Sequence, residues 1–173
     1  MKALKITLIV IGSIIGLCII VFGIYLLLNI QGVAESFEVG SPELEQKVLI
    51  ASQGSNFKNA LVDSLTEHLK EKSFYIKVVD VSALGEVNED EWNALMLIHT
   101  TQQNRLQPDV KEYLNRAKDL SKVILVTTSG PGEWKTKDYE VDIFTSASKM
   151  DELSSLTTKI LARLDLILAR ESI

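Results

Sequence analysis

Apolar residues form one unbroken run near the N-terminus of the chain. Residues 6–28 read ITLIVIGSIIGLCIIVFGIYLLL, and no charged residue occurs between Lys5 and Glu35. A helix of about 20 apolar residues crosses the roughly 30 Å hydrocarbon core of a bilayer. The run exceeds the roughly 7–15 apolar residues of a cleavable signal peptide, although Gly32-Val33-Ala34 offers a cleavage site. Residues 1–30 are therefore predicted to be a transmembrane anchor, with a cleaved signal peptide as the alternative.

The pattern changes after residue 46, where short apolar runs alternate with amphipathic segments. Strands are predicted at residues 48–51, 74–81, 94–99, 123–127 and 139–145. Helices are predicted at residues 57–71, from Pro108, and from residues 148–151, which resemble a capping box. Strands that alternate with helices indicate a parallel sheet covered on both faces. Residues 47–173 are thus predicted to form a doubly wound α/β domain with five strands.

Two connecting segments depart from this alternation. Residues 31–46 are polar and acidic and contain Gly32, Gly40 and Pro42, which predicts a flexible acidic linker. Residues 129–139 are short for a parallel crossover, which usually needs a dozen or more residues. A full covering helix is therefore not expected before the last strand.

Charge is distributed unevenly between the two parts. After residue 30 there are 16 basic and 23 acidic residues, a net charge of −7. Such an acidic domain argues against nucleic acid as a partner. Lys2 and Lys5 precede the apolar run, and acidic residues follow it. Under the positive-inside rule, we expect a single-pass protein of the cell membrane with a cytoplasmic N-terminus and an extracytoplasmic domain.

Small residues within the apolar run suggest a second role for it besides contact with the lipid bilayer. Gly12 and Gly16 form a small-xxx-small pair, which lets two membrane helices approach closely and predicts a weak homodimer. Cys18 is the sole cysteine, so no disulfide can form within the domain.

Ligands of doubly wound domains bind beyond the carboxyl ends of the strands. The first such loop, Ser52–Asn56, enters a helix and could hold an anion on backbone N–H groups, or simply cap that helix. The second, Thr100–Arg105, is strongly polar and is either a ligand contact or a solvated loop. The third, Thr127–Trp134, has two glycines that permit close approach, and its tryptophan either stacks on a ligand or packs over the sheet.

Other chemistry receives little support from the residue pattern. His68 and His99 have no cysteine or histidine at metal-ligand spacing, so no metal site is predicted. The acidic run at residues 86–91 is expected to be solvated.

The three loops in this strand order give the domain a resemblance to the flavodoxin-like family. KVLIASQGSNFKNALVDSLTEHL resembles its first strand, phosphate loop and helix, and VILVTTSGPGEW resembles its fourth strand and the loop around the isoalloxazine ring. The resemblance implies a sheet of order 2-1-3-4-5 and an FMN site. The residues that it would place around FMN are Ser52, Gly54, Ser55, Asn56, Thr100, Thr101, Gln102, Asn104, Ser129, Gly130, Gly132 and Trp134.

The phosphate loop departs from the family pattern. Gly54, Ser55 and Phe57 stand where the family usually has threonine, glycine and threonine. The first hypothesis is therefore a membrane-anchored binding or accessory module without a cofactor, which acts on an unknown protein partner. The alternative is a membrane-tethered FMN electron-transfer protein or small reductase. A nucleotide- or phosphosugar-binding domain would use the same anion site.

Overall fold

The computed structural model describes residues 2–29 and 31–171 of the chain. Residues 1, 30, 172 and 173, which the expected anchor and domain include, lie outside this part. The chain divides into two compact units, residues 1–31 and residues 32–173.

The first unit is a single helix, α1, which spans Lys2–Asn29. Its stretch Lys5–Ile24 is long and apolar enough to cross a membrane. Large apolar side chains on several sides of it, such as Ile9, Ile14 and Phe22, are exposed within the unit. A helix that exposes apolar side chains all round suits a lipid environment better than water.

The second unit contains a mostly parallel sheet. Its strands are β1 Gly32–Val33, β2 Phe37–Val39, β3 Lys47–Gly54, β4 Tyr75–Asp80, β5 Ala94–Thr100, β6 Val123–Thr128 and β7 Asp142–Ser146. The order is β2-β4-β3-β5-β6-β7, with β1 paired to β3. All contacts among β4, β3, β5, β6 and β7 are parallel, whereas β1 and β2 pair antiparallel.

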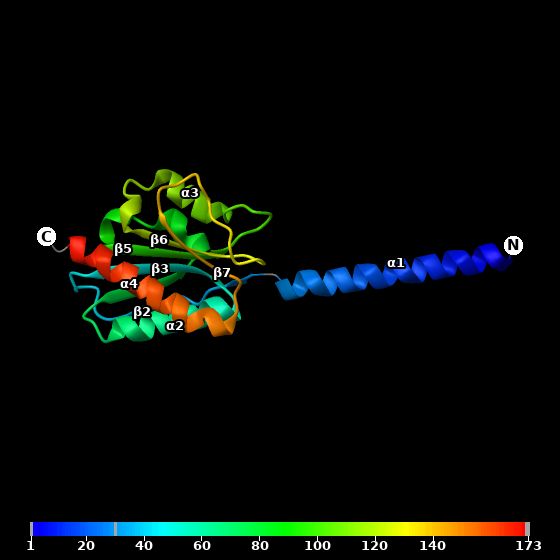
Figure 1. The fold of residues 1–173 in the computed structure, drawn as a ribbon, viewed down its shortest axis with the longest axis horizontal. Helices are drawn as coiled ribbons and strands as arrows, with labels where there is room; N and C mark the ends of the chain where they lie inside the picture. The colour runs from blue at the N-terminus through cyan, green and yellow to red at the C-terminus, as the bar shows by residue number, and fades with distance from the viewer. Residues whose placement is uncertain (1, 30, 172–173) are drawn as a thin grey trace. The chain divides into compact units, whose positions relative to one another are not determined.

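Helices cover both faces of this sheet (Figure 1). Helix α2, Asn56–Lys70, and helix α4, Leu153–Glu171, pack on one face through residues such as Leu61 and Ile160. Helix α3, Pro108–Arg116, and the 3₁₀ helix η1, Val81–Glu86, cover the other face. Strands buried on both faces need apolar residues at every position, which explains continuous runs such as residues 94–98.

Three short 3₁₀ turns complete the unit. They are η2 Glu89–Glu91, η3 Leu120–Lys122 and η4 Met150–Glu152. Residues 129–141, between β6 and β7, contain no helix, as expected from the length of this segment.

The structure corrects the expected flexible linker at residues 31–46. Strand β2 pairs with β4, and β1 pairs with β3, so the sheet has seven strands rather than five. Phe37 and Val39 pack against the apolar core beneath α2 and α4. Burial of these two side chains stabilises an ordered strand where the glycines and acidic residues had indicated a tether.

Two local expectations were also wrong. Ser148 does not cap the last helix: its φ is 60°, and η4 has Lys149 at its N-cap without a side-chain hydrogen bond. Glu89, in the acidic run at residues 86–91, is buried rather than solvated. Its carboxylate accepts hydrogen bonds from the backbone N–H groups of Lys118 and Asp119, both at 2.8 Å, which offsets the cost of burying it.

Candidate functional site

The candidate ligand loops follow the carboxyl ends of β3, β5 and β6, which are neighbours in the sheet. Parallel strands bring these ends to one edge, so the three loops lie at the same edge of the domain. We call this region the carboxyl edge: residues 52–56, 100–105 and 129–134, with β1 paired to Gln53 and Gly54.

Strand β1 occupies the end of β3 at this edge. Gly32 pairs with Gly54, and Val33 pairs with Gln53. A Cβ atom built on Gly54 would lie 2.6 Å from the carbonyl oxygen of Val33, a distance that side chains essentially never adopt. Only glycine therefore allows β1 to approach here. Its role is close contact with the chain's own backbone.

Asp80 fixes the residue that follows β1. Its Oδ2 accepts a hydrogen bond from the Ala34 N–H at 2.8 Å, and its Oδ1 accepts one from the Ser82 N–H at 3.0 Å. Ala34 is itself buried. We call residues 32–34, which are β1 and Ala34, the entry segment. One carboxylate thus ties the entry segment to the end of β4, where η1 begins.

The N-terminus of α2 carries its own cap. Ser55 is the N-cap residue, and its Oγ accepts hydrogen bonds from the Lys58 N–H at 3.3 Å and from Lys58 Nζ at 3.1 Å. Lys58 is buried, and this burial lowers the pKa of its ammonium group to about 8. Asn56, the first residue of the helix, is exposed. The hydroxyl proposed to bind a phosphate therefore serves as a helix cap.

A chain of short hydrogen bonds links β3, β5 and β6 at the carboxyl edge. Gln53 Oε1 accepts from the Thr100 N–H at 2.7 Å, and Thr100 Oγ1 lies 2.8 Å from Thr128 Oγ1. The Thr101 N–H donates to the Thr128 carbonyl oxygen at 2.8 Å. Ser52 is buried and donates to the Gln53 carbonyl oxygen. These polar groups bind one another, which rigidifies the edge.

His99, which precedes Thr100 in β5, is fully buried. Its Nδ1 lies 3.2 Å from the Thr100 carbonyl oxygen, and its Nε2 has no hydrogen-bond partner among the described residues. The pKa of His99 is lowered to about 4, mainly by burial; the hydrogen bond to Thr100 opposes this shift, and the positive charge of Lys58 adds a smaller lowering. The imidazole is therefore neutral at pH 7.

The second loop forms a tight exposed turn. The N–H groups of Gln102 and Arg105 donate to each other's carbonyl oxygens, at 3.2 and 3.0 Å. Gln103 and Asn104 have φ values of 51° and 57°, the left-handed conformation that a type I′ turn requires. Gln102 and Asn104 project into solvent, while Thr101 is half-buried.

The third loop is folded back by backbone contacts. Gly132 has a φ of 73°, and its N–H donates to Ser129 O and Oγ, both at 3.1 Å. The Trp134 carbonyl oxygen accepts a hydrogen bond from Thr127 Oγ1 at 3.0 Å. Trp134 is half-buried and Gly130 is exposed.

FMN, which the resemblance implies, does not fit the first of these loops. A phosphate there would need free backbone N–H groups and room before α2. Instead, β3 remains extended to Gly54, β1 lies against it, and Ser55 caps the helix. The carboxyl edge brings the expected residues together, but it does so around contacts that the chain makes with itself.

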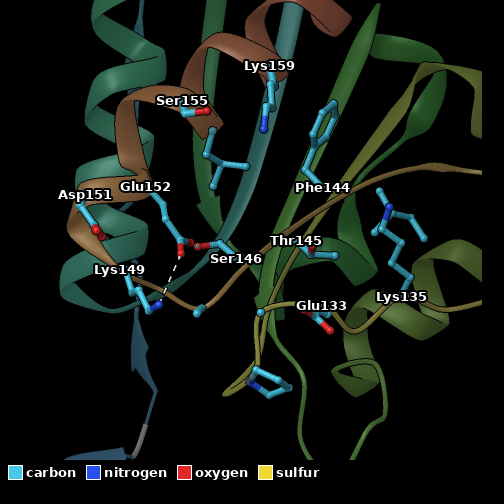
Figure 2. Close-up of a pocket in the computed structure, with 15 residues that line it drawn as sticks. Glu133, Lys135, Phe144, Thr145, Ser146, Lys149, Asp151, Glu152, Ser155 and Lys159 are labelled. Carbon is cyan, nitrogen blue, oxygen red and sulfur yellow. Dashed lines mark hydrogen bonds and ion pairs between the residues drawn. The ribbon is translucent and has the colours of Figure 1, made fainter.

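A separate hollow lies beside β7. It has a volume of about 710 Å³ and is bounded by Ile143–Ser146, by η4 and the start of α4, and by the loop at residues 131–135 (Figure 2). Ser146 Oγ donates to Glu152 at 2.9 Å on its wall. Gly132 is the only residue of the expected site that lines it. No sequence motif predicts this hollow, because its residues come from segments that only the fold brings together.

The prediction from the sequence also omitted several residues that hold the carboxyl edge together. Gln53, Asp80 and Thr128 hold its segments together, but isolated polar residues at strand ends form no recognisable motif. Within the described ranges, no group of acidic, histidine or cysteine residues could hold a metal ion.

Comparisons with known proteins do not assign the chain to a family. No protein-family model matches it, and neither does any curated protein.

Proposed function

We propose that this protein is a single-pass membrane protein whose flavodoxin-like domain is a binding or accessory module that works without FMN. The observation that carries the proposal is the pairing of β1 with Gln53 and Gly54, where a flavin phosphate would have to enter. The five parallel strands lie in the order β4-β3-β5-β6-β7, which corresponds to the 2-1-3-4-5 order of the resemblance. The fold therefore supports the family expectation, whereas the loop chemistry does not support its cofactor.

The anchor part of the proposal rests on α1. The stretch Lys5–Ile24 has the length and apolar character of a membrane span. The two lysines on its N-terminal side and the acidic domain on the other favour an extracytoplasmic domain. β1 begins at Gly32, so few residues separate the end of α1 from the first strand of the domain. A domain joined to a membrane span suits contact with other membrane proteins.

The surface for such a partner is the exposed part of the carboxyl edge. Gln102 and Glu133 project from loops that follow adjacent strands, and both are exposed. Ordered loops on a rigid sheet are the usual carriers of binding residues.

Site-specific photocrosslinking in native membranes tests this proposal. A photoreactive residue at Gln102 or at Glu133 of the full chain is expected to capture a protein of defined mass that is not a second copy of this chain. The same residue at Glu67, exposed on α2, is the matched control and is expected to capture none. Equal capture from all three positions, or none from the loops, would argue against a protein-binding edge.

A further inference from the structure

Strand β7 forms an open edge of the sheet. It follows β6 in the strand order, and no other strand of the described residues lies beyond it. No helix between β6 and β7 shields it, since residues 129–141 run as a loop. Ile143, Phe144 and Thr145 are only half-buried. Proteins normally protect an edge of this kind, because its free backbone groups can pair with another strand.

The pairing with β6 determines which backbone groups of β7 face outward. The Ser146 carbonyl oxygen accepts from the Ser129 N–H, so the backbone groups of Ser146 face β6. Backbone direction alternates along a strand, which places those of Asp142 and Phe144 on the same side. The N–H and C=O groups of Ile143 and Thr145 therefore face away from the sheet. Outside the pairing of β7 with β6, these groups form no backbone hydrogen bond with another described residue.

We infer that β7 is an interface at which a second copy of this chain pairs, antiparallel, to give one continuous sheet across two domains. The register that pairs all five residues of β7 puts a two-fold axis at Phe144, the middle residue. Ile143 then exchanges both backbone hydrogen bonds with Thr145 of the other copy, and the two Phe144 side chains face each other. Aromatic cross-strand pairs of this kind stabilise antiparallel strands.

The local charge around β7 allows a second copy as the occupant. The part of the chain after residue 30 carries a net charge of −7, so most approaches of two domains are repulsive. The hollow beside β7 is lined by three lysines and three acidic residues, and is locally neutral. Two of the lysines, Lys135 and Lys159, have no ion-pair partner among the described residues, and neither do Glu133 and Asp151. Two copies meeting there bring unpaired charges of both signs together.

The hollow also leaves space for the approach. Figure 2 shows Phe144, Thr145 and Ser146 on the strand and Ser155 and Lys159 on α4, with open space between them. Copies held in one membrane by α1 would meet at a raised effective concentration, so a short strand pair can suffice.

Disulfide crosslinking of the full chain in detergent micelles tests the pairing. Cys18 is the only cysteine, so a Cys18→Ser background carries a single new thiol after Phe144→Cys. Across the proposed axis the two Cα atoms lie about 4.5 Å apart, within the range that a disulfide spans. Mild oxidation is expected to give mostly linked dimer. Glu67→Cys, exposed on α2, is the control and is expected to give at most a tenth as much. Equal linkage at both positions, or none at Phe144→Cys, would overturn the inference.

The mass of the oligomer in two further variants distinguishes a dimer formed through β7 from a dimer formed through α1. Thr145→Pro removes an outward N–H and leaves the β6–β7 hydrogen bonds intact, so it should abolish the dimer while the circular dichroism spectrum of the folded chain is kept. Gly16→Ile, in α1, should leave the dimer in place. A monomeric wild-type chain, or a dimer lost with Gly16→Ile and kept with Thr145→Pro, would refute the pairing. So would linkage of Phe144→Cys to a different protein in native membranes. Should Thr145→Pro fail to fold, the crosslinking result decides.

Discussion

Gly54 and Val33 are in backbone contact so close that a Cβ atom on Gly54 would lie 2.6 Å from the Val33 carbonyl oxygen. Val33 belongs to the segment that directly follows α1, and Gly54 ends the first parallel strand. The contact therefore fixes the entry segment at the carboxyl end of β3. Doubly wound α/β domains bind their ligands at this end of the strands.

Gly54→Ala is expected to push β1 away from β3. The added methyl group meets backbone atoms, which cannot rotate aside, so overpacking should cost about 1–3 kcal/mol of the free energy of unfolding. Hydrogen exchange at the Val33 and Ala34 amides should become faster. Gly85→Ala is the control, because a Cβ there meets nothing within 4 Å. Unchanged protection of Val33 and Ala34 in Gly54→Ala would contradict the contact.

Asp80→Asn is expected to free one of the two N–H groups that the carboxylate holds. The two oxygens of Asp80 accept separately from Ala34 and Ser82, and asparagine has a single acceptor oxygen. Loss of a hydrogen bond to a charged group should cost about 1.5–3 kcal/mol. Denaturation followed by the fluorescence of Trp92 and Trp134 measures this, with Asp63→Asn, exposed on α2, as the control. Equal stability of the two variants would count against the two hydrogen bonds that the Asp80 carboxylate accepts from Ala34 and Ser82.

His99 should make the domain less stable in acid. Its pKa is about 4 in the fold, against an ordinary 6.5. Between these values the unfolded chain binds a proton and the folded chain does not. The free energy of unfolding should therefore fall by up to about 1.4 kcal/mol for each pH unit below 6.5, until pH 4 is reached.

The comparison with His99→Leu isolates this effect from that of the carboxylates. Denaturation curves at several pH values between 7 and 4 should show a shallower loss of stability in His99→Leu than in the wild type. His68→Gln, exposed on α2, should keep the wild-type slope. Parallel slopes for His99→Leu and the wild type would mean that folding does not lower the pKa of His99, and would contradict the buried neutral imidazole.

Tyr113→Phe is expected to leave stability unchanged or to raise it by up to about 1 kcal/mol. The Tyr113 hydroxyl is buried and has no hydrogen-bond partner in the described part of the chain. Burial also raises the pKa of this phenol well above its ordinary value. Tyr139→Phe is the matched contrast, because it loses a 2.7 Å bond to Asn115 and should not be stabilising. Thermal midpoints followed by tryptophan fluorescence compare the two, and a large loss in Tyr113→Phe would point to a hidden partner.

The parallel sheet could be predicted from the sequence because fully buried strands leave a clear signal. Runs such as residues 48–51 and 123–126 are apolar at every position and alternate with helical stripes. The absence of a helix between β6 and β7 could also be predicted, since a connection this short leaves no room for a full covering helix.

The carboxyl edge could be predicted only in part. Ser55, Thr100 and Ser129 were placed at it correctly by strand order alone. The partners of these residues could not be predicted from the sequence, because a serine at the position of Ser55 is equally typical of a phosphate site and of a helix N-cap. The role of β1 was missed because its pairing depends on Gly54, more than 20 residues away along the chain, and glycine looks the same in a turn and in a close contact.

The most direct test of the central claim is an FMN titration of the full chain in detergent micelles, followed by flavin fluorescence. Because β1 and the Ser55 cap lie where the resemblance would place the phosphate, we expect no quenching at about 100 µM FMN, a concentration at which a cofactor held with micromolar affinity would be saturated. Saturable quenching with one FMN per chain would contradict the account and favour a membrane-tethered electron carrier.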